Sequence, residues 1–288
     1  MLLIPAHAKV NLCLAVRGRR PDGFHDIDSV AVTVDWHDLV GVRVERSTET
    51  AAVLHVSGAG DLPAGTDNLA VRALHAVASI TGPLRAELWL DKRIPSGAGL
   101  GGGSADAAAV LRACALLVGH GDLTATALRQ LAASLGSDVP MLLAGGVQRM
   151  EGRGELLTPL LGAPTLHLAL AVAGFSDTAA TYAAVDHYDL ESGDRPGSLA
   201  AALDAGGAPD DGHLGSGLEA AACRVNPALD ERLTALRATM PDVRWHLTGS
   251  GGAAFALAPG RDEAEELAAS ARELGILARA CRTVGAAT

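Results

Sequence analysis

The chain has 288 residues, of which 49% are hydrophobic and 19% are charged, a balance typical of a folded globular protein with one large or two medium domains. The net charge of −10 argues against binding to nucleic acid or to an anionic membrane, and the longest apolar runs, such as residues 166–173, are too short to cross a bilayer. The cysteines are scattered without a C-x-x-C pair and the histidines form no H-E-x-x-H motif, so neither a disulfide framework nor a metal-ligand set is predicted.

The N-terminus, residues 1–5, is expected to form the first strand, and the next predicted strand covers residues 8–16. The N-terminus ahead of it has neither the basic region nor the cleavage pattern of a signal peptide, so we expect a cytoplasmic protein. The alternation of side chains predicts that Lys9, Asn11 and Cys13 share one face of this strand. The opposite, apolar face is expected to consist of Val10, Leu12, Leu14 and Val16.

The rest of the chain mixes strand and helix patterns, which predicts two α/β domains, residues 1–155 and 156–288, with a cleft between them. Residues 186–215 are rich in Gly, Asp, Pro and Ser and predict a connection that carries one short helix at 199–203. Further strands are expected at 30–34, 39–44, 53–56, 85–91, 166–172, 243–247, 253–257 and near the C-terminus. Helices are expected at 68–79, 104–118, 124–135, 178–185, 227–240 and 262–274.

The basic residues are unevenly divided. The chain contains 21 arginines but only two lysines, Lys9 and Lys92. A chain that uses arginine so widely is expected to keep lysine where a compact ammonium group is needed in place of a planar guanidinium. Both lysines fall in or beside the strongest motifs of the sequence.

Residues 95–105 form the most distinctive motif. The run Pro-Ser-Gly-Ala-Gly-Leu-Gly-Gly-Gly-Ser-Ala leads directly into a predicted helix. Its glycines leave backbone N–H groups uncovered and permit positive φ values, and the start of a helix adds further free N–H groups. We therefore predict a cradle for a polyphosphate, in which Ser104 is placed to cap the helix, contact a phosphate oxygen or help to hold Mg²⁺.

Three other interpretations of this segment compete with the phosphate cradle. A Walker loop ends in Gly-Lys-Ser or Gly-Lys-Thr, and this segment has no such lysine. A dinucleotide-binding fingerprint is formally present at Gly97, Gly99 and Gly102, but no apolar strand precedes it and no acidic residue follows at the expected distance. The third interpretation, a flexible turn, would hardly need so many glycines directly before a helix. Because the dinucleotide-binding fingerprint is formally present, a nicotinamide-dependent dehydrogenase stays as an alternative from another class of enzyme.

The glycine segment resembles the phosphate loop of the GHMP kinase superfamily. Two further segments resemble the other motifs of that superfamily, Ala8-Lys9-Val10-Asn11-Leu12 and Thr248-Gly249-Ser250-Gly251-Gly252-Ala253-Ala254-Phe255. The resemblance implies an α/β (α+β) fold of two domains, with the active site in the interdomain cleft. It also implies an ATP-dependent kinase that phosphorylates a small molecule.

Two more segments indicate a branch of the superfamily. Gly18-Arg19-Arg20-Pro21-Asp22-Gly23-Phe24-His25-Asp26-Ile27 and Gly136-Ser137-Asp138-Val139-Pro140 resemble the branch whose substrate is a methylerythritol linked to cytidine diphosphate. This resemblance covers residues 9–255 and implies transfer of the γ-phosphoryl group of ATP to the 2-hydroxyl, a step towards isoprenoids by the non-mevalonate route. A kinase of the homoserine or mevalonate type and a nucleotide-binding homologue with weak catalysis are the alternatives.

The resemblance also implies roles for individual residues. Asp138 would accept the proton of the substrate hydroxyl, and Lys9 would keep that carboxylate ionised and help to neutralise the phosphoryl oxygens. On the sequence alone, Lys9 could instead be a solvated strand residue and Asp138 the N-cap of a short helix. His25 would bond the cytosine edge, and Phe24 and Tyr182 would stack on the base.

The complete set of implied binding residues is larger. The substrate-binding residues are expected to be Asn11, Phe24, His25, Thr178, Tyr182, Gly249 and Ser250. The ATP-binding residues are expected to be Pro95, Ser96, Gly97, Ala98, Gly99, Leu100, Gly101, Gly102, Gly103, Ser104 and Ala105, with Lys92 and Asn68 near the adenosine. Lys92 as a surface lysine and Asn68 as a helix N-cap are the alternatives.

Two features of the sequence depart from the pattern of the branch. Phe24 stands where tyrosine is usual, and Ser216-Gly217 stands where Asn-Asp is usual, which leaves open how those positions shape the cleft. No carboxylate can be named as a metal ligand, so Mg²⁺ is expected to be held chiefly by ATP and water. The partners expected are the small-molecule substrate and, at most, a second copy of the chain in a weak homodimer.

Overall fold

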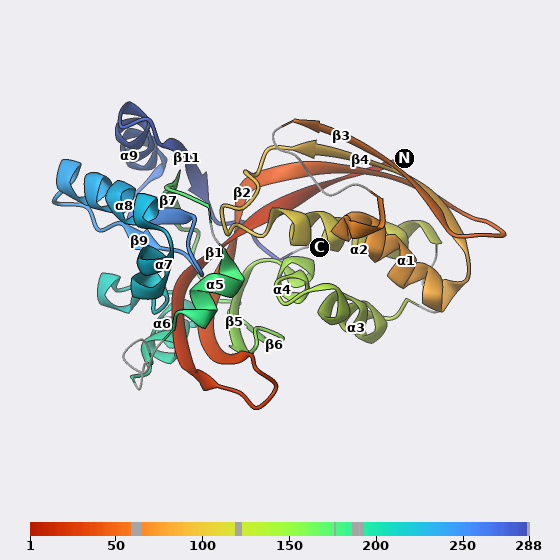
Figure 1. Ribbon diagram of the computed structural model, residues 1–288, viewed down its shortest axis with the longest axis horizontal. Helices are drawn as coiled ribbons and strands as arrows, with labels where there is room; N and C mark the ends of the chain where they lie inside the picture. The colour runs from red at the N-terminus through yellow and green to blue at the C-terminus, as the bar shows by residue number, and fades with distance from the viewer. Residues whose placement is uncertain (59–64, 119–122, 176, 186–189, 191–192, 287–288) are drawn as a thin grey trace.

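The computed structural model describes residues 1–58, 65–118, 123–175, 177–185, 190 and 193–286, and it confirms a mixed α/β fold (Figure 1). Two sheets make up the framework. The larger sheet carries helices α1 to α4 on one face, and the smaller sheet lies towards the other end of the molecule with helices α7 to α9 (Figure 1). Of the helices within the described ranges, none has the length and apolar character needed to span a membrane.

A long hairpin forms the centre of the larger sheet. Its strands, β1 (Leu2–Arg19) and β2 (His25–Arg46), pair antiparallel along nearly their whole length. One end of β2 also pairs with β5 and the other with β4, so the hairpin joins both ends of the sheet. The order is β3-β4-β2-β1-β8, with the β5–β6 hairpin attached to β2. The other strands are β3 (Ala51–Gly58), β4 (Leu84–Lys92), β5 (Val147–Gly152), β6 (Leu156–Pro159) and β8 (Gly215–Ser216).

The side chains of the strand predicted at 8–16 lie on the predicted faces only as far as the bulge that follows Asn11. A register shift interrupts the pairing of β1 with β2 between Asn11 and Cys13. Because such a bulge inserts an unpaired residue, the side chains after it exchange faces. Cys13 consequently packs in the core with Val10, whereas Leu14 lines the pocket that also holds Asn11. The expected common face of Val10, Leu12, Leu14 and Val16 is therefore wrong beyond the bulge, with Leu14 and Val16 in a separate cluster.

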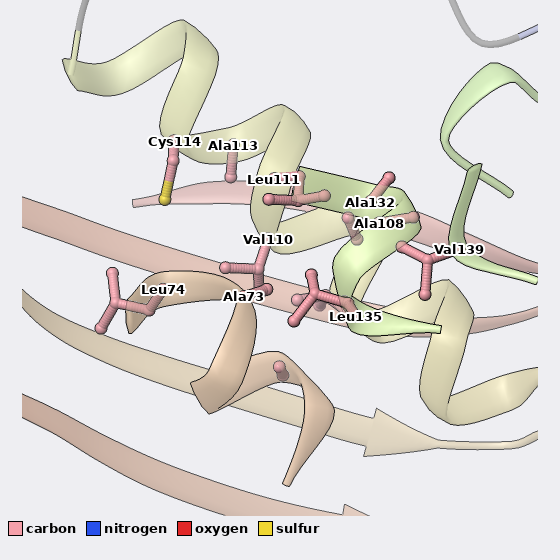
Figure 2. Close-up of a cluster of buried hydrophobic side chains, with 14 of the residues drawn as sticks. Ala73, Leu74, Ala108, Val110, Leu111, Ala113, Cys114, Ala132, Leu135 and Val139 are labelled. Atoms are coloured by element: carbon pink, nitrogen blue, oxygen red, sulfur yellow. The ribbon is translucent and has the colours of Figure 1, made fainter. Parts of the chain in front are cut away.

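An alanine-rich helix lies at the centre of the helical layer. In α2 (Gly102–Val118) the buried residues are mostly alanines, and these small side chains allow the sheet and three other helices to approach closely. Figure 2 shows Val110 and Leu111 of α2 among side chains of its neighbours, including Leu74 and Leu135. The neighbouring helices are α1 (Leu69–Thr81), which follows the short 3-10 helix η1 (Gly65–Asp67), α3 (Ala125–Leu135) and α4 (Val139–Ala144).

The smaller sheet has the order β11-β7-β10-β9 and buries both faces. Leu168, Leu170 and Phe255 point into a core shared with the larger sheet, and the alternate residues Ala169 and Ala254 face α8 and α9. Its strands are β7 (His167–Val172), β9 (His246–Leu247), β10 (Ala253–Ala258) and β11 (Leu277–Arg282). The remaining helices are α5 (Thr178–Ala183), α6 (Arg195–Asp204), the 3-10 helix η2 (Asp211–His213), α7 (Glu219–Val225), α8 (Pro227–Thr239) and α9 (Arg261–Glu273).

The sheets do not divide the chain at the expected boundary. The predicted division after residue 155 falls within the turn between β5 and β6, and β6 still belongs to the larger sheet. β8 adds a late segment of the chain to that sheet, beside β1. The core that contains Val10 and Phe255 is continuous between the two sheets. The two halves of the chain therefore pack as one body of shared hydrophobic core, and their assignment as two domains stays a prediction.

Most predicted elements are present, with differences at their ends, but the two strands expected at 30–34 and 39–44 are one continuous strand, β2. The elements that the sequence did not predict are short or form within turns, namely η1, α4, β5, β6, η2, β8 and α7. The expected strand at 243–247 is reduced to β9, and the expected helix at 104–118 begins two residues earlier, at Gly102. The helix expected at 199–203 is longer and begins at Arg195. Part of the expected connection, residues 186–189 and 191–192, lies outside the described residues.

Candidate active site

A single pocket collects predicted residues from both halves of the chain. Its volume is about 770 Å³, which suits a nucleotide-sized ligand. Its lining includes residues of β1, the start of α2, α5 and the turn between β9 and β10. The predicted residues that line it are Lys9, Asn11, Phe24, His25, Gly99, Gly101, Ser104, Asp138, Thr178, Tyr182, Gly249 and Ser250.

The glycine segment adopts the backbone of an anion-binding nest. Gly97, Gly99 and Gly101 have φ values of +74°, +75° and +73°, and no non-glycine residue described has a positive φ. The alternation of left-handed glycines with ordinary residues turns successive N–H groups towards one side. Directly after Gly101, α2 begins and presents the N-terminal end of its dipole. The local geometry is therefore that of a phosphate site.

The second glycine turn packs directly on this nest. A Cβ on Gly99 would lie 2.3 Å from the carbonyl oxygen of Gly251, and a Cβ on Gly252 would lie 2.7 Å from the carbonyl of Ala98. Such contacts leave no room for any side chain, so the two backbones approach as closely as glycine permits. A hydrogen bond from the Lys9 N–H to the Leu100 carbonyl, 3.0 Å long, also ties the nest to β1.

The two predicted catalytic residues meet in the pocket. The Nζ atom of Lys9 lies 3.7 Å from a carboxylate oxygen of Asp138, although the residues come from β1 and the start of α4. Asn11 holds the ammonium group in place, because its Oδ1 accepts a 2.6 Å hydrogen bond from Lys9 and its Nδ2 donates to Ser29 over 2.8 Å. The Lys9 side chain is 9% exposed. Its interpretation as a solvated strand residue is therefore wrong.

Asp138 occupies the N-cap position of α4 but does not cap the helix. Its side chain makes no hydrogen bond to the first turn, and its backbone has φ −84° and ψ −17°. The carboxylate is instead directed towards Lys9 and is 36% exposed in the pocket. The capping interpretation of Asp138 therefore fails, and the carboxylate is available to a substrate hydroxyl.

Gly249 must lack a side chain if the Lys9 ammonium is to keep its place. Its φ is +59°, and a Cβ would lie 3.0 Å from Asn11 Oδ1 and 3.3 Å from Lys9 Nζ. We expect Gly249→Ala to displace this pair and lower kcat by about 10²-fold, with a loss of stability of about 1–3 kcal/mol. Steady-state kinetics and urea unfolding measure the two effects. Gly206→Ala is a suitable control, because that glycine also has a positive φ but lies outside the pocket lining; equal kinetic losses would contradict the role of Gly249.

The far end of the pocket is aromatic. The rings of His25 and Tyr182 lie 5.2 Å apart at 30°, and Phe24 lines the same end. Partial burial, followed by the nearby Arg19 guanidinium, lowers the pKa of His25 below its ordinary value of 6.5. The imidazole is therefore neutral near pH 7 and can both donate and accept a hydrogen bond. Burial, followed by Asp138, raises the pKa of Tyr182, so its hydroxyl keeps its proton.

Lys92 and Asn68 do not line the pocket. The Asn68 side chain caps α1 by accepting a 2.9 Å hydrogen bond from Ala70 N. The ammonium of Lys92 is buried in ion pairs with Asp38 and, at 2.6 Å, with Asp106. Lys92 is therefore not a surface lysine, and its contact with adenosine has no support in this geometry. Burial, opposed by Lys92, raises the pKa of Asp106 to about 7.

Several predicted ATP-binding residues of the segment 95–105 do not line the pocket. Ala98, Leu100 and Ala105 are buried in the hydrophobic cores, so their side chains anchor the nest and only their backbone groups could contact a ligand. Gly102 and Gly103 belong to the first turn of α2. Of the remaining predicted ATP-binding residues, Pro95, Ser96 and Gly97 also lie outside the pocket lining.

The pocket also contains residues that the sequence did not single out for it. Ser137 stands in the quoted motif at 136–140, and Arg19, Gly23 and Ile27 stand in the quoted motif at 18–27, but none of the four was assigned to the pocket. Outside the pocket, Ser216 donates a 2.6 Å hydrogen bond to the Gly249 carbonyl, so the serine at the unusual position supports the second glycine turn. The unpredicted lining residues are Leu14, Arg19, Gly23, Ile27, Ser137, Met150, Arg153, Ala179, Ala183 and Val185.

The donors in the pocket suit a magnesium ion that is carried mainly by phosphates. Within the described ranges, no group of three or more His, Cys, Asp or Glu side chains could hold a metal ion by itself. The hydroxyl of Ser104 and the carboxylate of Asp138 nevertheless line the pocket, and both are the hard oxygen donors that Mg²⁺ prefers. The residues therefore fit Mg²⁺ as a partner of a bound polyphosphate.

Comparisons with known proteins agree with this geometry. Residues 68–146 match the family described as GHMP kinases N terminal domain. A 4-diphosphocytidyl-2-C-methyl-D-erythritol kinase of Salinispora tropica is 39% identical over 282 residues, which cover 95% of this chain and 88% of the relative. The crystal structure of a 4-(cytidine 5'-diphospho)-2C-methyl-D-erythritol kinase has a TM-score of 0.79 and 36% identity, and it matches 99% of this chain and 100% of its own. A mevalonate kinase structure has a TM-score of 0.66 at 13% identity, with 99% and 100% of the two chains covered, and shares the fold.

With this fold, and with a phosphate nest beside a lysine–carboxylate pair, the molecule is an ATP-dependent small-molecule kinase of the GHMP class. The extent of its similarity to the Salinispora relative narrows that class. The chain belongs to the 4-diphosphocytidyl-2-C-methyl-D-erythritol kinase family. Membership of this family excludes the dehydrogenase alternative and disfavours kinases of the homoserine and mevalonate type.

Proposed function

We propose that this protein transfers the γ-phosphoryl group of ATP to the 2-hydroxyl of 4-diphosphocytidyl-2-C-methyl-D-erythritol, a step of isoprenoid precursor synthesis. The observation that carries the proposal is the convergence of Lys9 and Asp138, 3.7 Å apart, on a pocket whose other parts are a glycine nest and an aromatic end. The nest suits the phosphates of ATP. The aromatic end suits a nucleobase, because planar rings stack well on a base.

The proposed step needs little covalent chemistry from the protein. The substrate oxygen attacks the γ-phosphorus, its proton passes to the carboxylate of Asp138, and the bond from phosphorus to the β–γ bridging oxygen breaks to release ADP. The ammonium of Lys9, held by Asn11, faces the region where negative charge develops. Mg²⁺, contacted by the Ser104 hydroxyl and otherwise by phosphates and water, would supply further neutralisation of the phosphate charge.

Release of ADP measured with a coupled enzyme assay tests the proposal directly. The methylerythritol substrate, homoserine and mevalonate are compared as acceptors at matched concentrations. Turnover with the first and not with the other two is expected, because the aromatic end of the pocket accommodates a base that the two smaller acids lack. Turnover with homoserine or mevalonate alone would refute the proposal, as would tight nucleotide binding without any ADP release.

The neutral imidazole of His25 is expected to recognise the cytosine edge. We predict that His25→Ala raises the KM for the cytidine substrate by about 10-fold to 100-fold, the cost of one to two buried hydrogen bonds, and changes the KM for ATP by far less. Because the pKa of His25 is lowered, the substrate KM of the unaltered enzyme should be constant above pH 7 and rise as the pH falls below the ordinary value of 6.5.

A matched control separates this effect from general damage. His75→Ala replaces another histidine of the same chain on α1, outside the pocket lining, and should leave both KM values unchanged. Equal increases in the two KM values of His25→Ala, or an acid-dependent rise that persists in that variant, would contradict the role of His25.

A further inference from the structure

Two arginines line the aromatic end of the pocket, Arg19 from the end of β1 and Arg153 from the turn between β5 and β6. Several arginines of this acidic chain form ion pairs, as Arg20 does with Asp22 at 3.2 Å. Among the described residues, neither Arg19 nor Arg153 forms an ion pair with a carboxylate, although Arg153 lies close enough to Asp22 to help lower the pKa of that carboxyl. A negative chain that brings guanidinium groups without ion-pair partners to its pocket creates a local positive potential there.

The side chain of Arg153 lies against a predicted base-binding residue. Its guanidinium carbon is 4.8 Å from the centre of the Phe24 ring, and Phe24 is 51% exposed. Stacking uses the flat face of a guanidinium group and leaves its N–H donors free at the edge. This geometry orients the donors of Arg153 without consuming them.

The nearby carboxylates accept hydrogen bonds from groups other than the Arg153 guanidinium. Glu155 accepts a 2.6 Å hydrogen bond from the backbone N–H of Arg153. Asp22 accepts from the backbone N–H of Phe24 at 3.1 Å and from Arg20 at 3.2 Å. Arg153 is also fixed at its backbone, because Gly152 and Gly154 on either side have positive φ values and form a tight turn. The guanidinium group of Arg153 is therefore held in position by the turn and the Phe24 ring, and its N–H donors bond neither of these carboxylates.

We propose that Arg153, stacked on Phe24, binds the phosphate groups of the nucleoside diphosphate part of the acceptor substrate and so determines its specificity. The planar fork of an arginine matches the oxygens of a phosphate group, and such charge-assisted bonds are the strong ones. This inference rests on the proposed function, since it assigns a substrate group to the same pocket. It explains how an enzyme of net charge −10 attracts an anionic acceptor to that end of its site.

Isothermal titration with CDP, CMP and cytidine tests the inference without any turnover. Arg153→Met is compared with the unaltered protein and with Arg129→Met, which removes an exposed arginine of α3 outside the pocket lining. We expect Arg153→Met to weaken CDP binding by about 10-fold to 100-fold, to weaken CMP less, and to leave cytidine unchanged. Arg129→Met should bind all three as the unaltered protein does.

The salt dependence of CDP binding is a second measurement, and a purely structural role of Arg153 would not change it. The affinity of the unaltered protein for CDP should fall as the salt concentration rises, and this dependence should be weaker in Arg153→Met. Equal losses for CDP and cytidine would overturn the inference, because they would show that Arg153 supports the ring and not the phosphates. Unchanged CDP binding in Arg153→Met would overturn it alone, whereas no CDP binding by the unaltered protein would overturn the proposed function as well.

Discussion

Asp138→Asn is expected to lower kcat by about 10²-fold to 10⁴-fold, the usual contribution of a general base. The amide keeps the size of the side chain but cannot accept the hydroxyl proton. Binding of ATP should survive, because the nest at Gly97, Gly99 and Gly101 is formed by backbone conformation and does not depend on the Asp138 side chain. Stability should change little, since the carboxylate caps no helix and is partly exposed.

Three measurements make this expectation specific. Coupled ADP release gives kcat, titration with a non-hydrolysable ATP analogue gives nucleotide affinity, and urea unfolding gives stability. Asp262→Asn is a matched control, because Asp262 is an exposed residue in the first turn of α9, outside the pocket lining. A kcat for Asp138→Asn within a few fold of the parent would remove Asp138 from the proposed mechanism, even if the nucleotide still bound normally.

Lys92→Met is expected to produce the largest loss of stability, about 3–5 kcal/mol in the free energy of unfolding. The Lys92 side chain is 2% exposed and lies between the carboxylates of Asp38 and Asp106, which are 0% and 3% exposed. Removing the ammonium leaves two buried carboxylates without a cation. Asp38 also accepts the backbone N–H groups of Arg93 and Ile94, immediately before the glycine segment, so the loss should loosen the nest.

The dependence on pH distinguishes this cluster from ordinary packing. The pKa of Asp106 is raised from 3.8 to about 7, so the folded state retains a proton over a range in which the unfolded state has released it. Stability must therefore fall as the pH rises between these two values. Without Lys92 the folded state should hold that proton more tightly, and the decline towards neutral pH should become steeper in Lys92→Met.

Neighbouring variants provide the controls for Lys92. Arg93→Met breaks an adjacent ion pair with Asp91 whose side chains are 46% and 41% exposed, and it should cost no more than about 1 kcal/mol. Lys92→Met combined with Asp106→Asn should recover part of the loss by removing one buried charge. Lys92→Arg keeps the charge but places a larger, planar group in the same buried space, and it too should destabilise. A loss below 1 kcal/mol for Lys92→Met would contradict the account.

The glycine motifs were predictable because their chemistry is local. Positive φ values at Gly97, Gly99 and Gly101 favour glycine whatever surrounds them, so the nest can be predicted from the glycines in the sequence. The scarcity of lysine was equally informative. Lys9 and Lys92 are both buried, each with close oxygen partners, as the need for a compact ammonium group predicts. The scarcity of lysine did not, however, indicate the role of each lysine. It could not predict that Lys92 forms buried ion pairs in the core and does not line the pocket.

Two features of the pocket could not be predicted from the sequence. The bulge after Asn11 moves Leu14 into the pocket and Cys13 into the core, and it depends on the register with β2. The stack of Arg153 on Phe24 joins residues from separate hairpins. Neither carries a repeated pattern or a restricted backbone, and both arise only when distant strands have paired.

By itself, then, the sequence indicated the glycine nest, because that follows from backbone freedom, and it indicated the class of kinase through the resemblance of its motifs to those of a known superfamily. Tertiary structure alone decided which residues come into contact. The Asn11 N–H donates a hydrogen bond to the hydroxyl of Thr248, 237 residues away in the sequence. Asp138, at the start of α4, forms an ion pair with Lys9 of β1. Contacts of that kind are set by strand register and by the packing of a shared core, which no local pattern records.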